Sequence, residues 1–221
     1  MRIAVLGTGV VGAALGTRLV QTGHEVRMGS RTAGNEKAQA WVAATGAGAS
    51  EGTFADAAAY GEVVVNATGG LVSLDALTAA GADNLAGKVL LDIANPLDFS
   101  GGFPPKVLQP DGRSLGEQIQ AAFPDTRVVK TLNTMNADVM VHPRALAGPH
   151  SVFVAGDDAD AKAVARDLLL GFGWTDDEVV DAGGIAASRG LELYLPLWLS
   201  LMGSFGTPSF NIAVVRAQVV A

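Results

Sequence analysis

Short apolar runs recur along the chain and alternate with segments in which apolar residues return every three or four positions. The runs are continuous, which is typical of parallel strands covered by helices on both faces. They predict strands at residues 3–6, 25–28, 63–66, 89–93, 128–131 and 152–155. The intervening segments predict helices at residues 10–22, 35–45, 54–60, 71–79, 115–123 and 159–170. This alternation predicts an α/β fold of the Rossmann type, with a doubly wound, mostly parallel sheet.

The pattern changes after residue 181, where Gly183-Gly184 precedes a long apolar, helix-like stretch and a β-rich run at 210–215. We therefore expect residues 1–181 to form the Rossmann domain. Residues 182–221 are expected to form a small helix-plus-strand element that packs on the crevice or on a partner subunit. Aromatic residues such as Tyr194 and Trp198 favour core packing or a subunit interface, and an apolar wall for a flat substrate is the alternative.

The turn after the first strand carries the sequence Gly7-Thr8-Gly9-Val10-Val11-Gly12. A strand precedes it and a helix-period segment follows it, which is the setting of a dinucleotide-binding turn. The first glycine permits the tight turn, the second lets the backbone approach a pyrophosphate, and the third lets the helix pack closely on the strand. The pyrophosphate would then lie at the positive end of the helix.

The end of the second strand distinguishes the two nicotinamide cofactors. An NAD site places Asp or Glu there to bind the ribose 2′-hydroxyl. This chain instead has Ser30, Arg31 and Thr32, and a guanidinium is suited to a 2′-phosphate. Lys37 adds a further positive charge, or lies on a solvated helix face. We favour NADP(H) over NAD(H).

Small polar residues follow three later strands, where the crevice of an open α/β sheet lies. They are Asn66, Ala67 and Thr68 after one strand, Asn95 and Pro96 after another, and Asn133 and Met135 after a third. We expect them to line the nicotinamide side of the cofactor. Their alternative role is that of ordinary turn formers.

Composition narrows the class of protein. The 221 residues are 49% hydrophobic, which allows a substantial core, and contain no cysteine. The net charge of −7 argues against a nucleic-acid partner. We find no secretory signal or membrane span and expect a cytoplasmic protein. The three histidines are dispersed, so no metal site is predicted, and no side chain emerges as a catalytic acid or base.

Together these features resemble the NADP oxidoreductases that depend on the deazaflavin coenzyme F420, and related dinucleotide-binding reductases. The resemblance rests on the glycine turn, on Gly29-Ser30-Arg31, on residues 128–137 and on the tail at 195–212. It implies hydride exchange between NADP(H) and a deazaflavin co-substrate, for which no protein acid or base is required. It also places Thr8, Gly9, Val10 and Val11 at the pyrophosphate. One departure is Ala67-Thr68-Gly69-Gly70, where the family often has a proline-containing turn.

Two other functions fit the same residues. An NADPH-dependent imine or ketone reductase would use the same nucleotide site with another small-molecule hydride acceptor. A non-catalytic redox sensor would bind NADP(H) and signal through its C-terminal surface. In each case we expect a homodimer. Lys106, Arg113 and Lys130 are the residues that can converge on an anionic deazaflavin tail.

Overall fold

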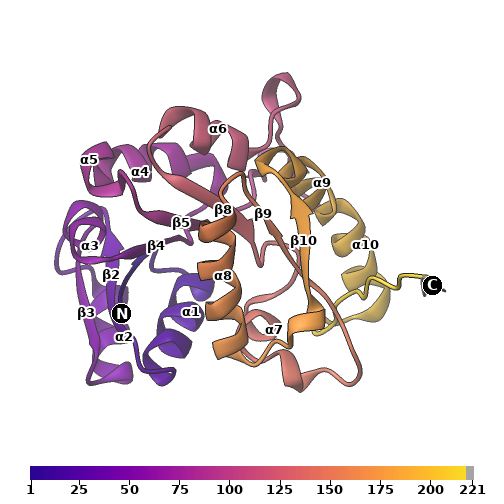
Figure 1. Ribbon diagram of the computed structural model, residues 1–221, viewed down its shortest axis with the longest axis horizontal. Helices are drawn as coiled ribbons and strands as arrows, with labels where there is room; N and C mark the ends of the chain where they lie inside the picture. The colour runs from indigo at the N-terminus through magenta and orange to yellow at the C-terminus, as the bar shows by residue number, and fades with distance from the viewer. Residues whose placement is uncertain (218–221) are drawn as a thin grey trace.

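The computed structural model describes residues 1–217, and its centre is one eight-stranded sheet (Figure 1). The strand order is β10-β9-β8-β5-β4-β1-β2-β3. The strands are β1 (Arg2–Leu6), β2 (Glu25–Ser30), β3 (Ala49–Thr53), β4 (Val63–Asn66), β5 (Val89–Asp92), β8 (Arg127–Thr131), β9 (Val152–Ala155) and β10 (Val179–Gly183). A separate antiparallel hairpin consists of β6 (Leu97–Asp98) and β7 (Lys106–Val107).

Within residues 1–217, ten α-helices connect these strands or follow them. They are α1 (Val10–Gln21), α2 (Glu36–Thr45), α3 (Phe54–Tyr60), α4 (Ser73–Ala80), α5 (Ala82–Leu85), α6 (Leu115–Ala122), α7 (Ala137–Val141), α8 (Ala159–Phe172), α9 (Ser188–Leu193) and α10 (Leu195–Phe205). Side-chain caps fix where several of them begin. Asn35, Thr53, Ser114, Asn136 and Asp158 each accept a hydrogen bond from a backbone N–H in the first turn of the helix that follows.

Six neighbouring strands are parallel to one another and have the order of a doubly wound dinucleotide-binding sheet, β3-β2-β1-β4-β5-β8. β9 then pairs antiparallel with β8, and β10 pairs parallel with β9. After β1 the chain builds β2 and β3 toward one edge of the sheet. It then returns to the other side of β1 and builds β4, β5 and β8 toward the opposite edge. The carboxyl ends of β1 and β4 therefore flank the switch point, where such sheets bind their ligands.

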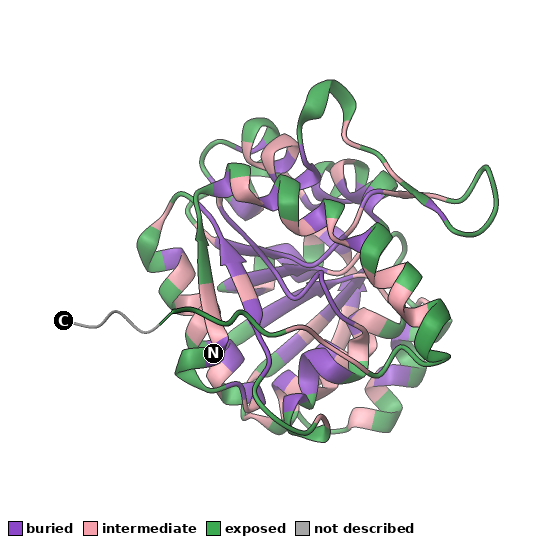
Figure 2. Ribbon diagram, turned by 90° about the vertical axis from the view of Figure 1, so that its right-hand side faces the viewer, coloured by how far each residue is buried: buried purple, intermediate pink, exposed green. Residues whose placement is uncertain are grey.

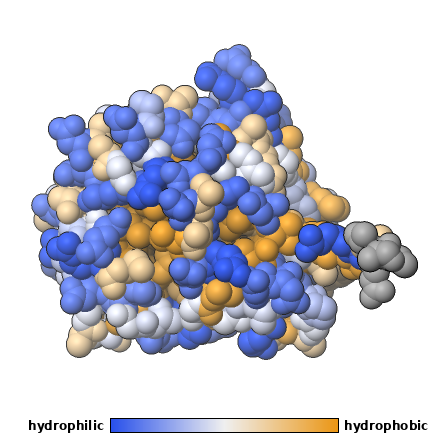
Figure 3. Space-filling model, viewed as in Figure 1, coloured by the Kyte–Doolittle hydropathy of each residue, from blue (hydrophilic) through white to orange (hydrophobic). Residues whose placement is uncertain are grey.

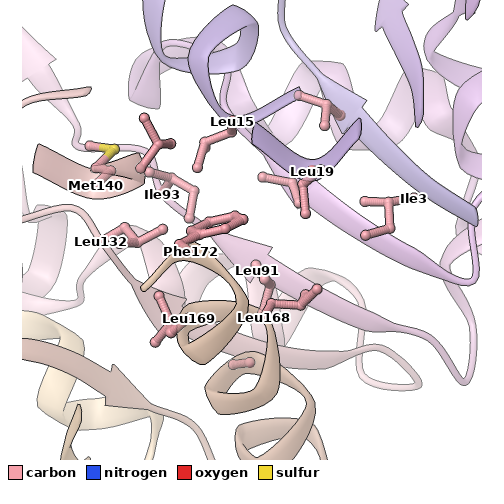
Figure 4. Packing of buried hydrophobic residues seen from close by; sticks show 14 of the residues in the cluster. Ile3, Leu15, Leu19, Leu91, Ile93, Leu132, Met140, Leu168, Leu169 and Phe172 are labelled. Atoms are coloured by element: carbon pink, nitrogen blue, oxygen red, sulfur yellow. The ribbon is translucent and has the colours of Figure 1, made fainter. Parts of the chain in front are cut away.

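Alternate residues of the central strands pack into two separate hydrophobic clusters. Ile3 and Val5 of β1 pack with α1, α2, α7 and α8, as the side chains in Figure 4 show for part of the cluster. Ala4 and Leu6 of the same strand pack on the other face, with α3 to α6. Because both faces are covered, the strands lie buried in the middle of the molecule in Figure 2. This explains why the apolar runs in the sequence are continuous.

All six predicted strands and all six predicted helices form, so the predicted fold class is confirmed. The strands β3 and β10 escaped prediction because each lies at an edge of the sheet and is partly exposed. β10 spans residue 181, where we divided the chain, and the division itself stays a prediction.

The C-terminal region is helical, and the strand expected at 210–215 does not form. These residues are instead held against the loop before β9. Asn211 Nδ2 lies 2.8 Å from His150 Nδ1, and the Ser151 N–H donates to the Ile212 carbonyl. Only the second of these hydrogen bonds uses the backbone of residues 210–215, and no strand ladder forms along them. Residues 218–221 of the predicted element lie outside the described part of the chain.

Candidate dinucleotide site

The turn between β1 and α1 requires glycine at two positions. Gly7 has φ +119°, and its N–H donates to the Gly29 carbonyl. A Cβ on Gly7 would lie 2.5 Å from the Ala67 carbonyl oxygen of the neighbouring strand end. A Cβ on Gly12 would overlap the Gly7 carbonyl oxygen. The turn and the first helix can therefore approach the sheet this closely only with glycine at 7 and 12.

Gly9 differs from these two glycines. A Cβ there would meet no atom within 4 Å, and its backbone is extended, with φ −79° and ψ −178°. It is the N-cap of α1, no side chain caps that helix, and no acidic residue lies in its first turn. The positive end of α1 thus faces open space beside Gly9, an arrangement that fits a phosphate group.

A cavity of about 550 Å³ opens beside this turn. It extends to the end of β2, where Ser30 is buried and Arg31 is exposed. The Ser30 hydroxyl donates to the Thr32 carbonyl at 2.6 Å, which fixes the strand end. The Arg31 guanidinium forms no ion pair with any residue in the described range 1–217. The cavity lining also includes Asn35, Phe54, Val72, Asp75, Ala76 and Ala79.

A second cavity, of about 210 Å³, lies on the other side of the β4 end. Ala67, Thr68 and Gly69 line both cavities, so the two spaces meet at the turn after β4. Most of the remaining wall is apolar. It consists of Val11, Gly70, Ile93, Ala94, Asn95, Leu97, Asn133, Met135, Met140, Leu195 and Trp198. Leu195 and Trp198 belong to α10, so this helix forms part of the wall of the smaller cavity.

The structure brings most of the predicted site residues together. Those that line one or both cavities are Gly7, Thr8, Gly9, Val11, Ser30, Arg31, Ala67, Thr68, Asn95, Asn133 and Met135. Pro96 lines a neighbouring cavity under the β6–β7 hairpin. Five others line none of these three cavities: Val10, Thr32 and Lys37 are exposed, and Gly12 and Asn66 are buried.

Behind the wall of the smaller cavity lies a buried ionic cluster that we did not predict from the sequence. Lys130 Nζ is 2.8 Å from Asp92 Oδ2 and 2.9 Å from Glu192 Oε1, and all three side chains are 0% exposed. Burial alone lowers the pKa of Lys130, but the two carboxylates outweigh it and raise that pKa. Lys130 is therefore a charged structural residue. The expectation that it converges with Lys106 and Arg113 on an anionic tail is wrong, because Lys130 is buried while the other two are exposed.

Neither a metal-binding cluster nor a membrane-spanning helix is present in the described residues. No group of three His, Asp or Glu side chains within 1–217 is placed to hold a metal ion. Over the same residues, no helix is long and apolar enough to cross a membrane. The open end of α1 and the free guanidinium of Arg31 are both groups suited to phosphates.

Comparison with known proteins identifies the family to which the chain belongs. A sequence model described as "NADP oxidoreductase coenzyme F420-dependent" matches residues 2–96. The F420-dependent NADP reductase of Methanothermobacter marburgensis is 30% identical over 212 residues, which cover 91% of this chain and 92% of that protein. Rat metalloreductase STEAP3 is also 30% identical, over 206 residues, but this chain spans only 38% of its length.

A solved structure resembles the chain along its whole length. It is the crystal structure of a candidate F420-dependent NADP reductase from Arthrobacter sp. FB24, which is 51% identical. The alignment has a TM-score of 0.93 and covers 98% of this chain and all of the other. The chain therefore belongs to the family of coenzyme F420-dependent NADP oxidoreductases.

Proposed function

We propose that this protein transfers hydride between NADP(H) and the deazaflavin coenzyme F420. The observation that carries the proposal is the meeting of two cavities at Ala67–Gly69. One cavity offers groups suited to phosphates and the other offers a mostly apolar wall. An extended dinucleotide placed across that junction would put its charged half and its nicotinamide in matching surroundings.

The nucleotide half would be held by backbone and by a few side chains. Gly7, Thr8, Gly9 and Val11 surround the pyrophosphate position at the open end of α1. Arg31 binds the 2′-phosphate as a bidentate donor beside Ser30, and the exposed Thr32 and Lys37 follow it in the chain. Gly12 and Val10 act through the backbone of the turn.

The nicotinamide half would reach the smaller cavity past Thr68, toward Asn95, Asn133 and Met135. When bound, the nicotinamide supplies or accepts the hydride, and the protein's part is to orient the rings and exclude water. Trp198, Leu195 and Met140 form an apolar wall that suits a flat ring such as a deazaflavin. No acid or base in this wall is needed for direct hydride transfer.

Rapid mixing under anaerobic conditions tests this function. NADPH and the protein are mixed with oxidised F420, and the visible absorbance of the deazaflavin is followed. We expect its loss with NADPH and a much slower loss with NADH. Protein that binds NADPH by calorimetry but leaves the absorbance unchanged would contradict the proposal. In that case, imine or ketone reduction and redox sensing become the functions to assay.

We also propose that the enzyme is a homodimer that pairs through α10. This helix carries no charged residue, and the side chains of Leu197 and Phe205 are 55% and 57% exposed. Figure 3 shows a hydrophobic band across the middle of one face, reaching the side on which the C-terminal segment lies. An uncharged apolar helix can pack on its own copy about a two-fold axis without opposing like charges.

A further inference from the structure

The buried ionic cluster joins three parts of the fold that lie far apart in the sequence. Asp92 ends β5, Lys130 lies in β8 opposite Asp92, and Glu192 lies in the C-terminal helix α9. Lys130 also donates to the Ala94 carbonyl, in the wall of the smaller cavity. Lys130 thus connects α9 to the wall of the smaller cavity.

The cluster has one more negative charge than positive, and the first turn of α6 offsets it. Glu192 Oε2 accepts from the Leu115 N–H at 3.0 Å, and Oε1 accepts from the Gly116 N–H at 3.2 Å. Gln109 Nε2 adds a third donor at 3.3 Å. Both carboxylate oxygens of Glu192 are therefore satisfied by groups that only donate, and an amide in its place would oppose donor to donor.

At its other end, the cluster reaches the junction of the two cavities. Asp92 Oδ1 accepts from Asn66 Nδ2 at 2.9 Å. Asn66 Oδ1 in turn accepts from the Thr68 hydroxyl at 2.6 Å and from the Thr68 N–H at 3.3 Å. Because an ionised carboxylate can only accept, it fixes the amide of Asn66 in this orientation. Thr68, which lines both cavities, thereby takes its orientation from Asp92 in β5, and Lys130 joins Asp92 to Glu192 of α9.

We propose that Glu192, Lys130, Asp92 and Asn66 form a positioning network that couples the C-terminal helices to nucleotide binding through Thr68. The proposal rests on the placement of NADP(H) across the two cavities given above. None of the charged members lines either cavity, so the network acts through neighbours that do, chiefly Thr68 and Ala94. The chain of contacts supplies a physical route for coupling, and a coupling energy is its test.

The main test is Glu192→Gln, read out as the dissociation constant of NADPH and as steady-state kinetics. We expect the dissociation constant to rise about tenfold, the size of effect found for residues in one hydrogen-bond network. The KM for NADPH should rise in parallel, while kcat at saturating NADPH stays within about twofold, because bound nucleotide restores the position of Thr68. The matched control is Arg189→Gln. It removes the partly exposed ion pair between α9 and Glu117 and should leave NADPH affinity unchanged.

A double-mutant cycle separates positioning from general destabilisation. In a Thr68→Val background, Glu192→Gln should cost much less NADPH affinity than it does in the wild type. Equal losses in both backgrounds would overturn the proposal, as would equal affinities of Glu192→Gln and Arg189→Gln. If Glu192→Gln fails to fold, Asn66→Ser interrupts the hydrogen bonds between Asp92 and Thr68 while the three charges stay paired. Unchanged NADPH affinity in Asn66→Ser would equally refute the proposal. Wild-type protein that does not bind NADPH would contradict the proposed function instead.

Discussion

Gly7 and Ala67 approach each other so closely that a Cβ on Gly7 would lie 2.5 Å from the Ala67 carbonyl oxygen. Gly7 also has φ +119°, which an L side chain rarely adopts. Gly7→Ala should therefore reduce the free energy of unfolding by about 2 kcal/mol or more, since it adds a backbone clash to a strained dihedral. Urea denaturation followed by circular dichroism measures this loss.

The matched variant Gly9→Ala should affect binding and spare the fold. Its Cβ enters open space, so the free energy of unfolding should change by less than about 1 kcal/mol, the cost of a poorer N-cap. The same methyl group would occupy the place where we expect the pyrophosphate, and calorimetry should find NADPH binding strongly weakened. Normal NADPH affinity in Gly9→Ala would place the phosphates elsewhere.

Arg31→Ala tests the choice of cofactor. Losing a charge-assisted pair with the 2′-phosphate should weaken NADPH binding by about 1.5–3 kcal/mol, or roughly 10- to 150-fold. NADH lacks that phosphate, so its affinity should stay the same or improve. Titrating both nucleotides against wild type and variant gives the comparison. An equal loss of affinity for NADH and NADPH would mean that Arg31 does not bind the 2′-phosphate.

The Rossmann half of the fold was predictable because its rules are local. The turn at Gly7–Gly12 and the continuous apolar runs depend on neighbours in sequence and on burial from both faces. Strand ends at Ser30 and Thr68 were predicted to share one edge because parallel strands align their carboxyl ends, and both line the larger cavity. Asn66 was placed correctly at its strand end, yet its side chain lies behind the cavity wall, a distinction that strand position alone does not provide.

The buried cluster was missed because its members are brought together only by the tertiary fold. Glu192 and Lys130 are 62 positions apart, and nothing local pairs them. A signal was nevertheless present. A lysine in the middle of a buried apolar strand and a glutamate in the most apolar stretch each need a partner, because an unpaired charge is costly to bury. Glu178 is a similar case, because it lies in an acidic run in the sequence and yet is 3% exposed and paired with Arg144.

Lys130→Met should destabilise the protein severely. It leaves Asp92 and Glu192 buried without their cation, and breaking such a pair costs about 3–5 kcal/mol. Lys162→Met is the control, because Lys162 pairs with the largely exposed Asp181, and such a pair contributes about 0–1 kcal/mol. Thermal melts of the two variants should differ widely. If their midpoints fall equally, the buried cluster does not contribute more than a surface pair.

Acid should unfold the protein partly through Glu178. Burial raises the pKa of this carboxyl, but hydrogen bonds from Arg144 and Thr175 outweigh it and lower the pKa from 4.5 to about 2. A carboxyl whose folded-state pKa is lowered stabilises the fold above its unfolded-state value and loses that contribution as pH falls. The melting temperature should therefore drop between pH 4.5 and about 2. In Glu178→Gln the melting temperature should drop less over this pH range. If it drops equally in the variant and the wild type, Glu178 does not contribute to acid unfolding.

Leu197→Asp tests the proposed dimer. Leu197 is 55% exposed on α10, so an aspartate there can be solvated in a monomer and should leave the fold intact. In a two-fold pairing of α10 helices, the same change would bring two buried carboxylates to the interface, and their desolvation and mutual repulsion should dissociate it. Light scattering should find a dimer for the wild type and a monomer for the variant. Phe99→Asp is the matched comparison, because it adds the same charge at an exposed apolar position outside α10. A wild-type protein that is monomeric, or a Leu197→Asp protein that stays dimeric, would show that α10 does not form the interface.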